Sequence, residues 1–226
     1  MAFNFVPNTG TTFWPGGTFV SGTIAPAAAT DWAIMVTEGS GPVIAGWTTE
    51  SGYIHKQLSS AAPFSLSYPS IPIDTPVDPF ANILAAFPTT GAVSVAQQIG
   101  NVSGFVGAGT YTFPNSGPPT KTVTAGNSIF VLISKESPSP TAADPVVTDT
   151  AGHIYEKAYV VQTIAEPDTS HYSVGAGLYV ARNIPATVAL AVQVVLSDQV
   201  DSVQVIEMSG IGGPARGFTE ICLFGV

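Results

Sequence analysis

The chain has 226 residues, of which 45% are hydrophobic and only 9% charged, and it carries a formal net charge of −9. This composition supplies enough apolar material for a sizeable core and excludes an intrinsically disordered chain, which would need low hydrophobicity and high charge. The six basic residues are spread singly and cannot form a phosphate-tracking patch, so we expect no nucleic-acid partner. No run of about 18 apolar residues occurs, so we expect no membrane span.

The low charge leaves two explanations open: a surface rich in uncharged polar residues, or a surface buried against partner subunits. The first residues have no basic region followed by a long apolar run, so we expect no signal peptide. The single cysteine, Cys222, cannot form an intramolecular disulfide and fits synthesis in a reducing cytosol. Synthesis in the cytosol, combined with a low content of charged residues that is common in extracellular and viral β-proteins, leads us to expect localisation to a virion, with synthesis in the cytoplasm of a host cell.

The first half of the chain predicts short strands between turns. Residues 1–9 form an apolar arm in which Phe3 and Phe5 share one face of an extended segment. Short runs rich in β-branched and aromatic residues predict the strands that follow, at 18–25, 32–37, 42–49, 52–58, 83–87 and 92–99. Residues 61–79 contain five prolines and are predicted to be a long ordered loop that carries Tyr68, Ile71 and Ile73.

The second half predicts seven strands, with a further contribution from residues 217–224. They lie at about 120–125, 128–134, 145–149, 153–164, 173–181, 187–197 and 202–208. The sixth of them has large apolar residues at every second position, with mostly smaller or polar residues between, which predicts one buried face. These apolar residues are Val188, Leu190, Val192, Val194 and Leu196. Strands at this spacing indicate a sandwich or a jelly roll rather than a parallel sheet.

Internal repetition divides the chain into two lobes. The segment around Gly52 matches that around Gly152, and Ser103-Gly104 matches Ser209-Gly210 at a nearly constant offset. We therefore predict an all-β fold of two tandem antiparallel β-sandwich lobes, with jelly-roll and Ig-like topologies left open. The predicted boundaries are 1–9 for the N-terminal arm, 10–108 for the first lobe, 109–213 for the second lobe and 214–226 for a tail that closes the second lobe.

Four strings of the second lobe resemble a known kind of repeat. They are Val-Thr-Ala-Gly-Asn at 123–127, Val-Thr-Asp-Thr-Ala-Gly-His-Ile-Tyr at 147–155, Leu-Tyr-Val-Ala-Arg-Asn-Ile at 178–184 and Ile-Glu-Met-Ser-Gly at 206–210. Together they look like a β-sandwich repeat of phage virion structural proteins and large bacterial surface proteins. The resemblance implies a structural or adhesive role and brings no catalytic motif.

No residue pattern predicts catalysis. His55 and His153 follow the matched turns and are expected to be structural, while His171 is predicted in an exposed loop, and no Gly-x-Ser-x-Gly elbow is present. The loop aspartates have the spacing of turn residues rather than of Ca²⁺ ligands, so we expect no metal and no cofactor. Glu207 lies mid-strand among apolar neighbours, and a pair with Arg182 would satisfy its charge.

These observations predict an assembly protein rather than an enzyme. The first expectation is a phage capsid decoration or cement protein that contacts the major capsid protein or other virion subunits and forms a homo-oligomer on the particle. The alternative is a receptor- or carbohydrate-binding module, with Trp14, Trp32, Trp47, Tyr53 and Tyr68 as stacking surfaces. The candidate partner contacts are Phe3, Phe5, Tyr68, Ile71, Ile73, Phe218, Leu223 and Phe224. Deletion of residues 1–9 is expected to leave a folded protein that no longer binds particles.

Overall fold

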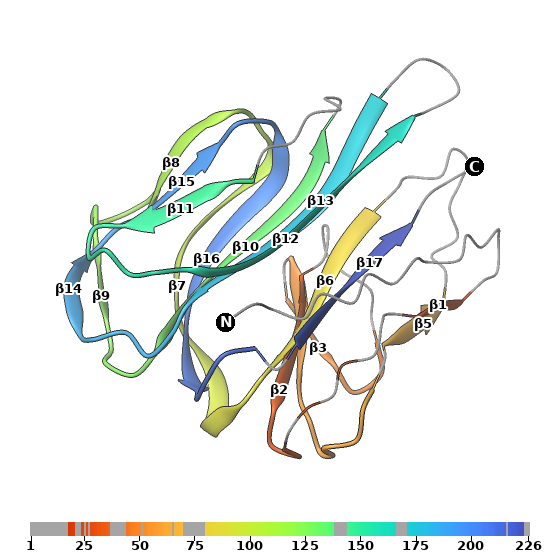
Figure 1. The fold of residues 1–226 in the computed structure, drawn as a ribbon. Helices are drawn as coiled ribbons and strands as arrows, with labels where there is room; N and C mark the ends of the chain where they lie inside the picture. The colour runs from red at the N-terminus through yellow and green to blue at the C-terminus, as the bar shows by residue number, and fades with distance from the viewer. Residues whose placement is uncertain are drawn as a thin grey trace.

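The structure is a computed structural model that describes residues 18–20, 24, 26, 28–36, 44–50, 52–64, 66–69, 80–137, 144–165, 171–215 and 217–223. Within these residues the chain forms strands β1 to β17 and no helix, and every strand pairing is antiparallel (Figure 1). The predicted all-β class is therefore confirmed.

A five-stranded sheet forms the middle layer. Its order is β12 (Glu156–Ala165), β13 (His171–Ala181), β10 (Ser128–Ser137), β16 (Val200–Ile211) and β7 (Thr89–Val106). In β10 the side chains alternate between two cores, since Ile129, Val131 and Ile133 face one side and Phe130 and Leu132 the other. A strand buried on both faces accounts for the continuous apolar run at its start.

A smaller layer covers one face of the middle sheet. It contains a three-stranded sheet, ordered β11 (Val146–Asp149), β15 (Val192–Leu196) and β8 (Gly109–Phe113), and the pair β14 (Thr187–Leu190) and β9 (Lys121–Val123). Phe113, Val123, Leu190, Val192 and Val194 from this layer are fully buried against the middle sheet. Figure 1 shows the two layers as the halves of a sandwich.

A second five-stranded sheet covers the opposite face. Its order is β17 (Gly217–Leu223), β6 (Phe80–Phe87), β2 (Trp32–Val36), β4 (Tyr53–Gln57) and β3 (Thr48–Glu50). Trp32, Phe87 and Phe130 form the centre of the core between the two sheets, with ring centroids 5.3–6.4 Å apart. This is within the range in which aromatic rings attract one another beyond their area burial.

The outer face of this second sheet carries a third core. Met35, Ile54 and Leu84 pack there against Ile24 and Leu66. The short pair β1 (Thr18–Val20) and β5 (Ser67–Pro69) and the bridge between Ile24 and Phe64 bring in the segments of this layer. Every residue of β2 is thus buried, because its side chains alternate between the two cores on either side of the sheet.

Two strand pairings cross the predicted lobe boundaries. β7 precedes residue 109 but pairs with β16 in the middle sheet, and β17 pairs with β6 in the sheet of the first half. The expectation that the C-terminal strand closes the second lobe is therefore wrong, because its hydrogen-bond partner is β6. The division into lobes 10–108 and 109–213 stays a prediction.

The matched glycines share their backbone conformation but not their surroundings. Gly52 and Gly152 have φ of 81° and 74°, and Gly104 and Gly210 have φ of 87° and 82°. The turn at Gly52 is a hairpin between β3 and β4, whereas the turn at Gly152 leads from β11 in the small sheet to β12 in the middle sheet. The matched segments therefore form different kinds of turn, although the left-handed conformation that favours glycine is common to both.

Candidate functional site

The buried carboxylate of Glu207 accepts hydrogen bonds from the turn between β9 and β10. Its side chain is 1% exposed, and its oxygens accept hydrogen bonds from Asn127 Nδ2 at 2.5 Å, Gln97 Nε2 at 2.5 Å and Thr124 N at 2.9 Å. Thr124 and Asn127 belong to the turn between β9 and β10, which also closes on itself through a bond from Asn127 N to Thr124 O. Neutral donors thus satisfy this charge, as a buried carboxylate requires.

The predicted pair between Glu207 and Arg182 is wrong. Arg182 binds Glu156 through two hydrogen bonds, one of them from Nε to Oε2 at 3.1 Å. Glu207 shares its cross-strand row with Ile129 and Ala181, which face the small sheet. Arg182 is one residue further along, so strand alternation directs it away from that face.

A second polar cluster holds the loop between β11 and β12. Asp149 Oδ1 accepts bonds from the amides of Ala151 and His153, and Oδ2 contacts His153 Nδ1 at 2.9 Å and Tyr155 Oη at 2.8 Å. Burial by itself raises the pKa of the Asp149 carboxyl, but the hydrogen bonds from His153 and Tyr155 outweigh it, so this pKa lies below its usual value. Burial and the adjacent Asp149 charge raise the pKa of Tyr155. His153 thus has the turn role expected of it.

His55 is also structural. It lies in β4, and its Nδ1 accepts a hydrogen bond from the indole Nε1 of Trp32 at 3.3 Å. Burial lowers the pKa of His55, although the charge of Glu50 opposes this shift. His171, by contrast, begins β13 and pairs with Ala165, so the predicted exposed loop at this position is wrong.

The side of the molecule formed by β7 and β8 carries no charged side chain, unlike the two polar clusters around Glu207 and Asp149. Among the described strands, β7 is the end strand of the middle sheet and β8 the end strand of the small sheet, and residues 107–108 connect them directly. No charged side chain occurs between Asp78 and Lys121. We name β7 and β8 the uncharged edge.

Most side chains of the uncharged edge reach solvent. Those of β7 that are exposed include Thr90, Ser94, Val95, Ala96 and Gln98, and Val95 is 41% exposed. Natural sheets usually protect an exposed edge strand with charged residues, proline or bulges. β7 has irregular register against β16 but neither charge nor proline along its length. The uncharged edge is therefore suited to contact with another protein.

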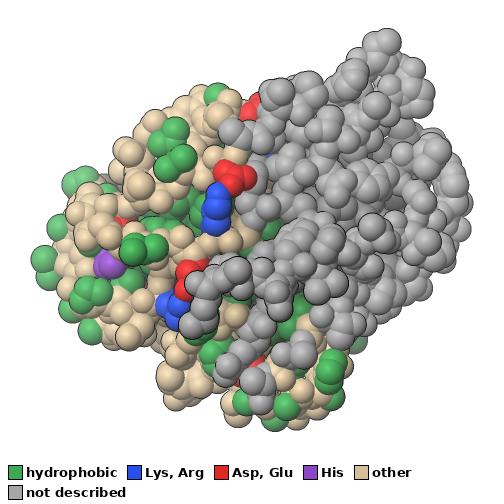
Figure 2. All heavy atoms as spheres, viewed as in Figure 1, with side chains coloured by type: hydrophobic (Ala, Val, Ile, Leu, Met, Phe, Trp, Pro, Cys, Tyr) green, Lys and Arg blue, Asp and Glu red, His purple; other side chains and the backbone are tan. Residues whose placement is uncertain are grey.

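The outer face of the small sheet continues this uncharged surface. Two cross-strand rows cover it, Val146–Val195–Thr110 and Thr148–Gln193–Thr112, and all six side chains are exposed. Ile154 and Val188, at 89% and 81%, are the most exposed large apolar side chains of the described residues. Figure 2 shows few charged side chains on the part of its visible face that belongs to this layer.

The sequence-predicted contact residues fall in three places. Phe218 and Leu223 lie in β17, opposite Ala85 and Phe80, and Tyr68 lies in β5, opposite Phe19. Phe3, Phe5, Ile71, Ile73 and Phe224 lie outside the described residues, as do the 1–9 arm and most of the proline-rich loop. Their role as partner contacts stays a prediction.

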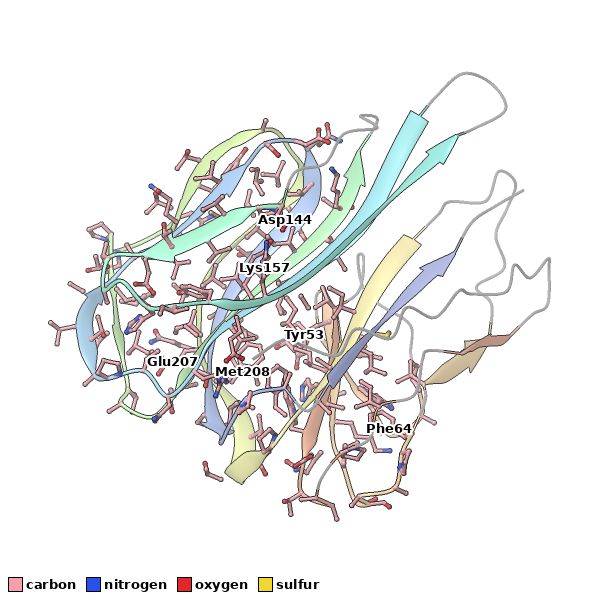
Figure 3. The ribbon with its side chains drawn as sticks, viewed as in Figure 1. Tyr53, Phe64, Asp144, Lys157, Glu207 and Met208 are labelled. Atoms are coloured by element: carbon pink, nitrogen blue, oxygen red, sulfur yellow. The ribbon has the colours of Figure 1, made fainter. Side chains whose placement is uncertain are left out.

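Two of the aromatic residues considered for stacking on a sugar belong to the core. Trp32 is 1% exposed and Tyr53 4% exposed, and both pack between the first-half sheet and the middle sheet. Figure 3 labels Tyr53. Burial, together with the charge of Glu50, raises the pKa of Tyr53 to about 12. Trp47 packs against the outer core, and Trp14 lies outside the described residues. The expectation is therefore wrong for Trp32 and Tyr53, which have no exposed ring face.

No three His, Cys, Asp or Glu side chains of the described residues come together as a metal site, and no helix among these residues could span a membrane. The comparisons with protein-family models, with curated proteins and with solved structures found no match. Sequence reasoning missed the uncharged edge, although the long interval without charge between Asp78 and Lys121 was a signal for it.

Proposed function

We propose that the chain is a structural protein of a phage virion, a decoration or cement protein that stabilises the capsid by docking through its uncharged edge. The observation that carries the proposal is the pair of end strands β7 and β8, which carry no charged residue along their length and expose most of their side chains. Association by addition of a strand to such an edge uses main-chain hydrogen bonds for affinity. The partner in this proposal is the major capsid protein or another virion subunit, including further copies of the chain.

The distribution of charge also supports an assembly role. Three of the six basic side chains already form ion pairs with acidic neighbours, namely Lys135 with Asp198, Lys157 with Asp144 and Arg182 with Glu156. The remaining charge is predominantly negative, which would oppose association through a charged face. An uncharged edge avoids this repulsion, because removing it from water does not require burial of unpaired charges.

A sedimentation experiment tests the proposal. The purified chain is mixed with isolated heads and, separately, isolated tails of the phage that encodes it, and the bound fraction is measured after centrifugation. We expect stoichiometric binding to heads. A chain that stays in the supernatant with heads, or that sediments only with tails, would contradict the capsid assignment.

Two matched substitutions test the docking surface. Val95→Lys places a charge on β7, and Val146→Lys places the same charge on β11, at the far edge of the small sheet, where valine is 55% exposed. We expect Val95→Lys to weaken head binding at least about tenfold, which corresponds to about 1.4 kcal/mol. Val146→Lys should bind like the wild type. Equal effects of both substitutions would show that the uncharged edge has no special part in docking.

A further inference from the structure

Lys135 is a buried amine at one end of the sandwich. Its side chain is 1% exposed, and it lies on the same face of β10 as Val131 and Ile133, which belong to the core beneath the small sheet. Lysine is among the residues least often fully buried, and an ammonium group there must be paired. Its Nζ lies 2.8 Å from Oδ2 of Asp198, in the turn between β15 and β16.

A second carboxyl approaches the same place. β10 and β16 pair in register from Ser128 opposite Met208 to Ser134 opposite Ser202, and the next residues on the two strands are Lys135 and Asp201. Directly opposed residues of antiparallel strands share a face and have Cβ atoms about 4.5–5.5 Å apart. Oδ2 of Asp201 is buried. One buried amine therefore lies beside an acyl carbon, Cγ of Asp198, and the register of β10 and β16, continued by one residue, sets the Asp201 carboxyl opposite Lys135.

We propose that Lys135 and Asp198 become joined by an intramolecular amide bond, with Asp201 as the group that carries the proton. The condensation begins with transfer of one proton from Lys135 to Asp198, which gives the amine and the carboxylic acid that react. Nζ then attacks Cγ of Asp198, and the nitrogen passes a proton to the Asp201 carboxylate. Asp201 returns that proton to the departing hydroxyl group, so that a bond between nitrogen and carbon replaces one between carbon and oxygen and one water leaves.

The site supplies what this condensation needs without another reagent. The reacting groups are held in contact by the fold, which replaces the entropy loss of an encounter in solution. Burial of the lysine end limits access of water, which would favour the reverse reaction. The product links β10 in the middle sheet to the turn that follows β15 in the small sheet, and it closes a covalent loop over a separation of 63 residues.

The chain contains a matched control pair. Lys157 and Asp144 also form an ion pair, and Figure 3 shows their side chains close together, but they are 52% and 48% exposed. Water has access to both groups there, so the exclusion of water that the condensation needs is missing. The proposal therefore predicts a cross-link at the buried pair and none at the exposed pair.

Mass spectrometry of the intact full-length protein, together with its tryptic peptides, tests the cross-link. We expect the wild type to be lighter than its sequence by one water and to yield a branched peptide that joins Lys135 to Asp198. Lys135→Arg should have its full sequence mass, and Lys157→Arg should keep the loss of water. Asp198→Asn should still cross-link with loss of ammonia, whereas Asp201→Asn should leave the two side chains unjoined.

Several results would overturn the proposal. A wild-type protein of full sequence mass with two separate linear peptides would mean that Lys135 and Asp198 form an ion pair only. A loss of water that persists in Lys135→Arg would place the modification elsewhere, and a complete cross-link in Asp201→Asn would remove the role of Asp201. The branched peptide is sought in the wild type, so the test remains decisive even if a variant fails to fold.

Discussion

Substitution of Glu207 should destabilise the protein through one identifiable turn. Its carboxylate accepts three hydrogen bonds, from Asn127, Gln97 and the amide of Thr124, and its side chain is 1% exposed. Glu207→Ala removes all three acceptors, and a buried donor left without a partner costs about 1–3 kcal/mol. Thr124 and Gln97 can recover bonds to water, because Thr124 is exposed and Gln97 half-buried, whereas Asn127 is buried. We therefore expect a loss of at least about 1–3 kcal/mol in the free energy of unfolding, most of it from the unsatisfied amide of Asn127.

Glu207→Gln is the sharper variant, because it preserves shape and changes only the donor pattern. The amide oxygen can still accept from Thr124 and Asn127, but the new NH₂ group then faces the NH₂ group of Gln97, which also donates to Thr122 O at 2.6 Å. If the Gln97 amide rotated by half a turn, its oxygen would face the new NH₂ group but would also lie against the carbonyl oxygen of Thr122. One hydrogen bond is lost in either case, so we expect a loss of about 1–3 kcal/mol.

Urea unfolding at neutral pH measures both losses as shifts of the midpoint at constant slope. Hydrogen exchange of the Thr124 amide gives a local readout, since this amide donates directly to Glu207. The amide should lose protection in Glu207→Ala and keep most of it in Glu207→Gln. A loss of less than about 1 kcal/mol in Glu207→Ala, or unchanged protection of Thr124, would refute the assignment of this turn to Glu207.

Three further predictions concern single positions. Gly210→Ala should lower the free energy of unfolding by about 1–3 kcal/mol from backbone strain alone, because φ is +82° and a Cβ would lie 2.4 Å from Ala92 O. Gly91→Ala is the control: a Cβ there meets nothing within 4 Å, so urea unfolding should show almost no change. Folding lowers the pKa of Asp149, so the stability that its carboxylate contributes is present above about pH 3.9 and is lost as the pH falls further. Asp149→Asn should therefore lower the urea midpoint at pH 7 and reduce the decrease of that midpoint at acid pH. A decrease at acid pH equal to that of the wild type would contradict this. Folding also lowers the pKa of His55, so as the pH falls the unfolded chain takes up this proton before the folded chain does, and stability should decrease below about pH 6.5. His55→Gln should therefore reduce the difference between the urea midpoints at pH 7.5 and pH 5.5. A difference equal to that of the wild type would contradict this role of His55.

Local strand patterns were predictable where burial on two faces dominates, and pairings between distant segments were not. The apolar run at the start of β10 identified that strand because its side chains fill two cores. Residues 187–197 were predicted as a single strand with Val188 buried, yet Val188 is 81% exposed and the strand is interrupted at Ala191. Thr150 causes this break, since its hydroxyl and amide bond the backbone of Ala189 and Ala191. Nothing within residues 187–197 encodes that contact.

The same reason explains the errors in the candidate site. Arg182 and Glu207 were paired as two unusual charges, but only the register of β13, β10 and β16 places them on opposite faces. The uncharged edge became visible once β7 was known to end one sheet and β8 to end the next. Composition could indicate an uncharged segment, whereas its position at an edge depends on pairings that span the chain.

The pairing of β17 with β6 has a consequence for how the protein is made. During synthesis β6 emerges long before Gly217–Leu223, so this edge of the first-half sheet stays unpaired until the strands of the middle and small sheets have also emerged. Contacts between segments so far apart slow folding, because the chain must close a long loop before they form. The nascent chain thus has an open β6 edge for most of its synthesis, and binding of that edge by a chaperone or by another nascent chain would compete directly with native closure.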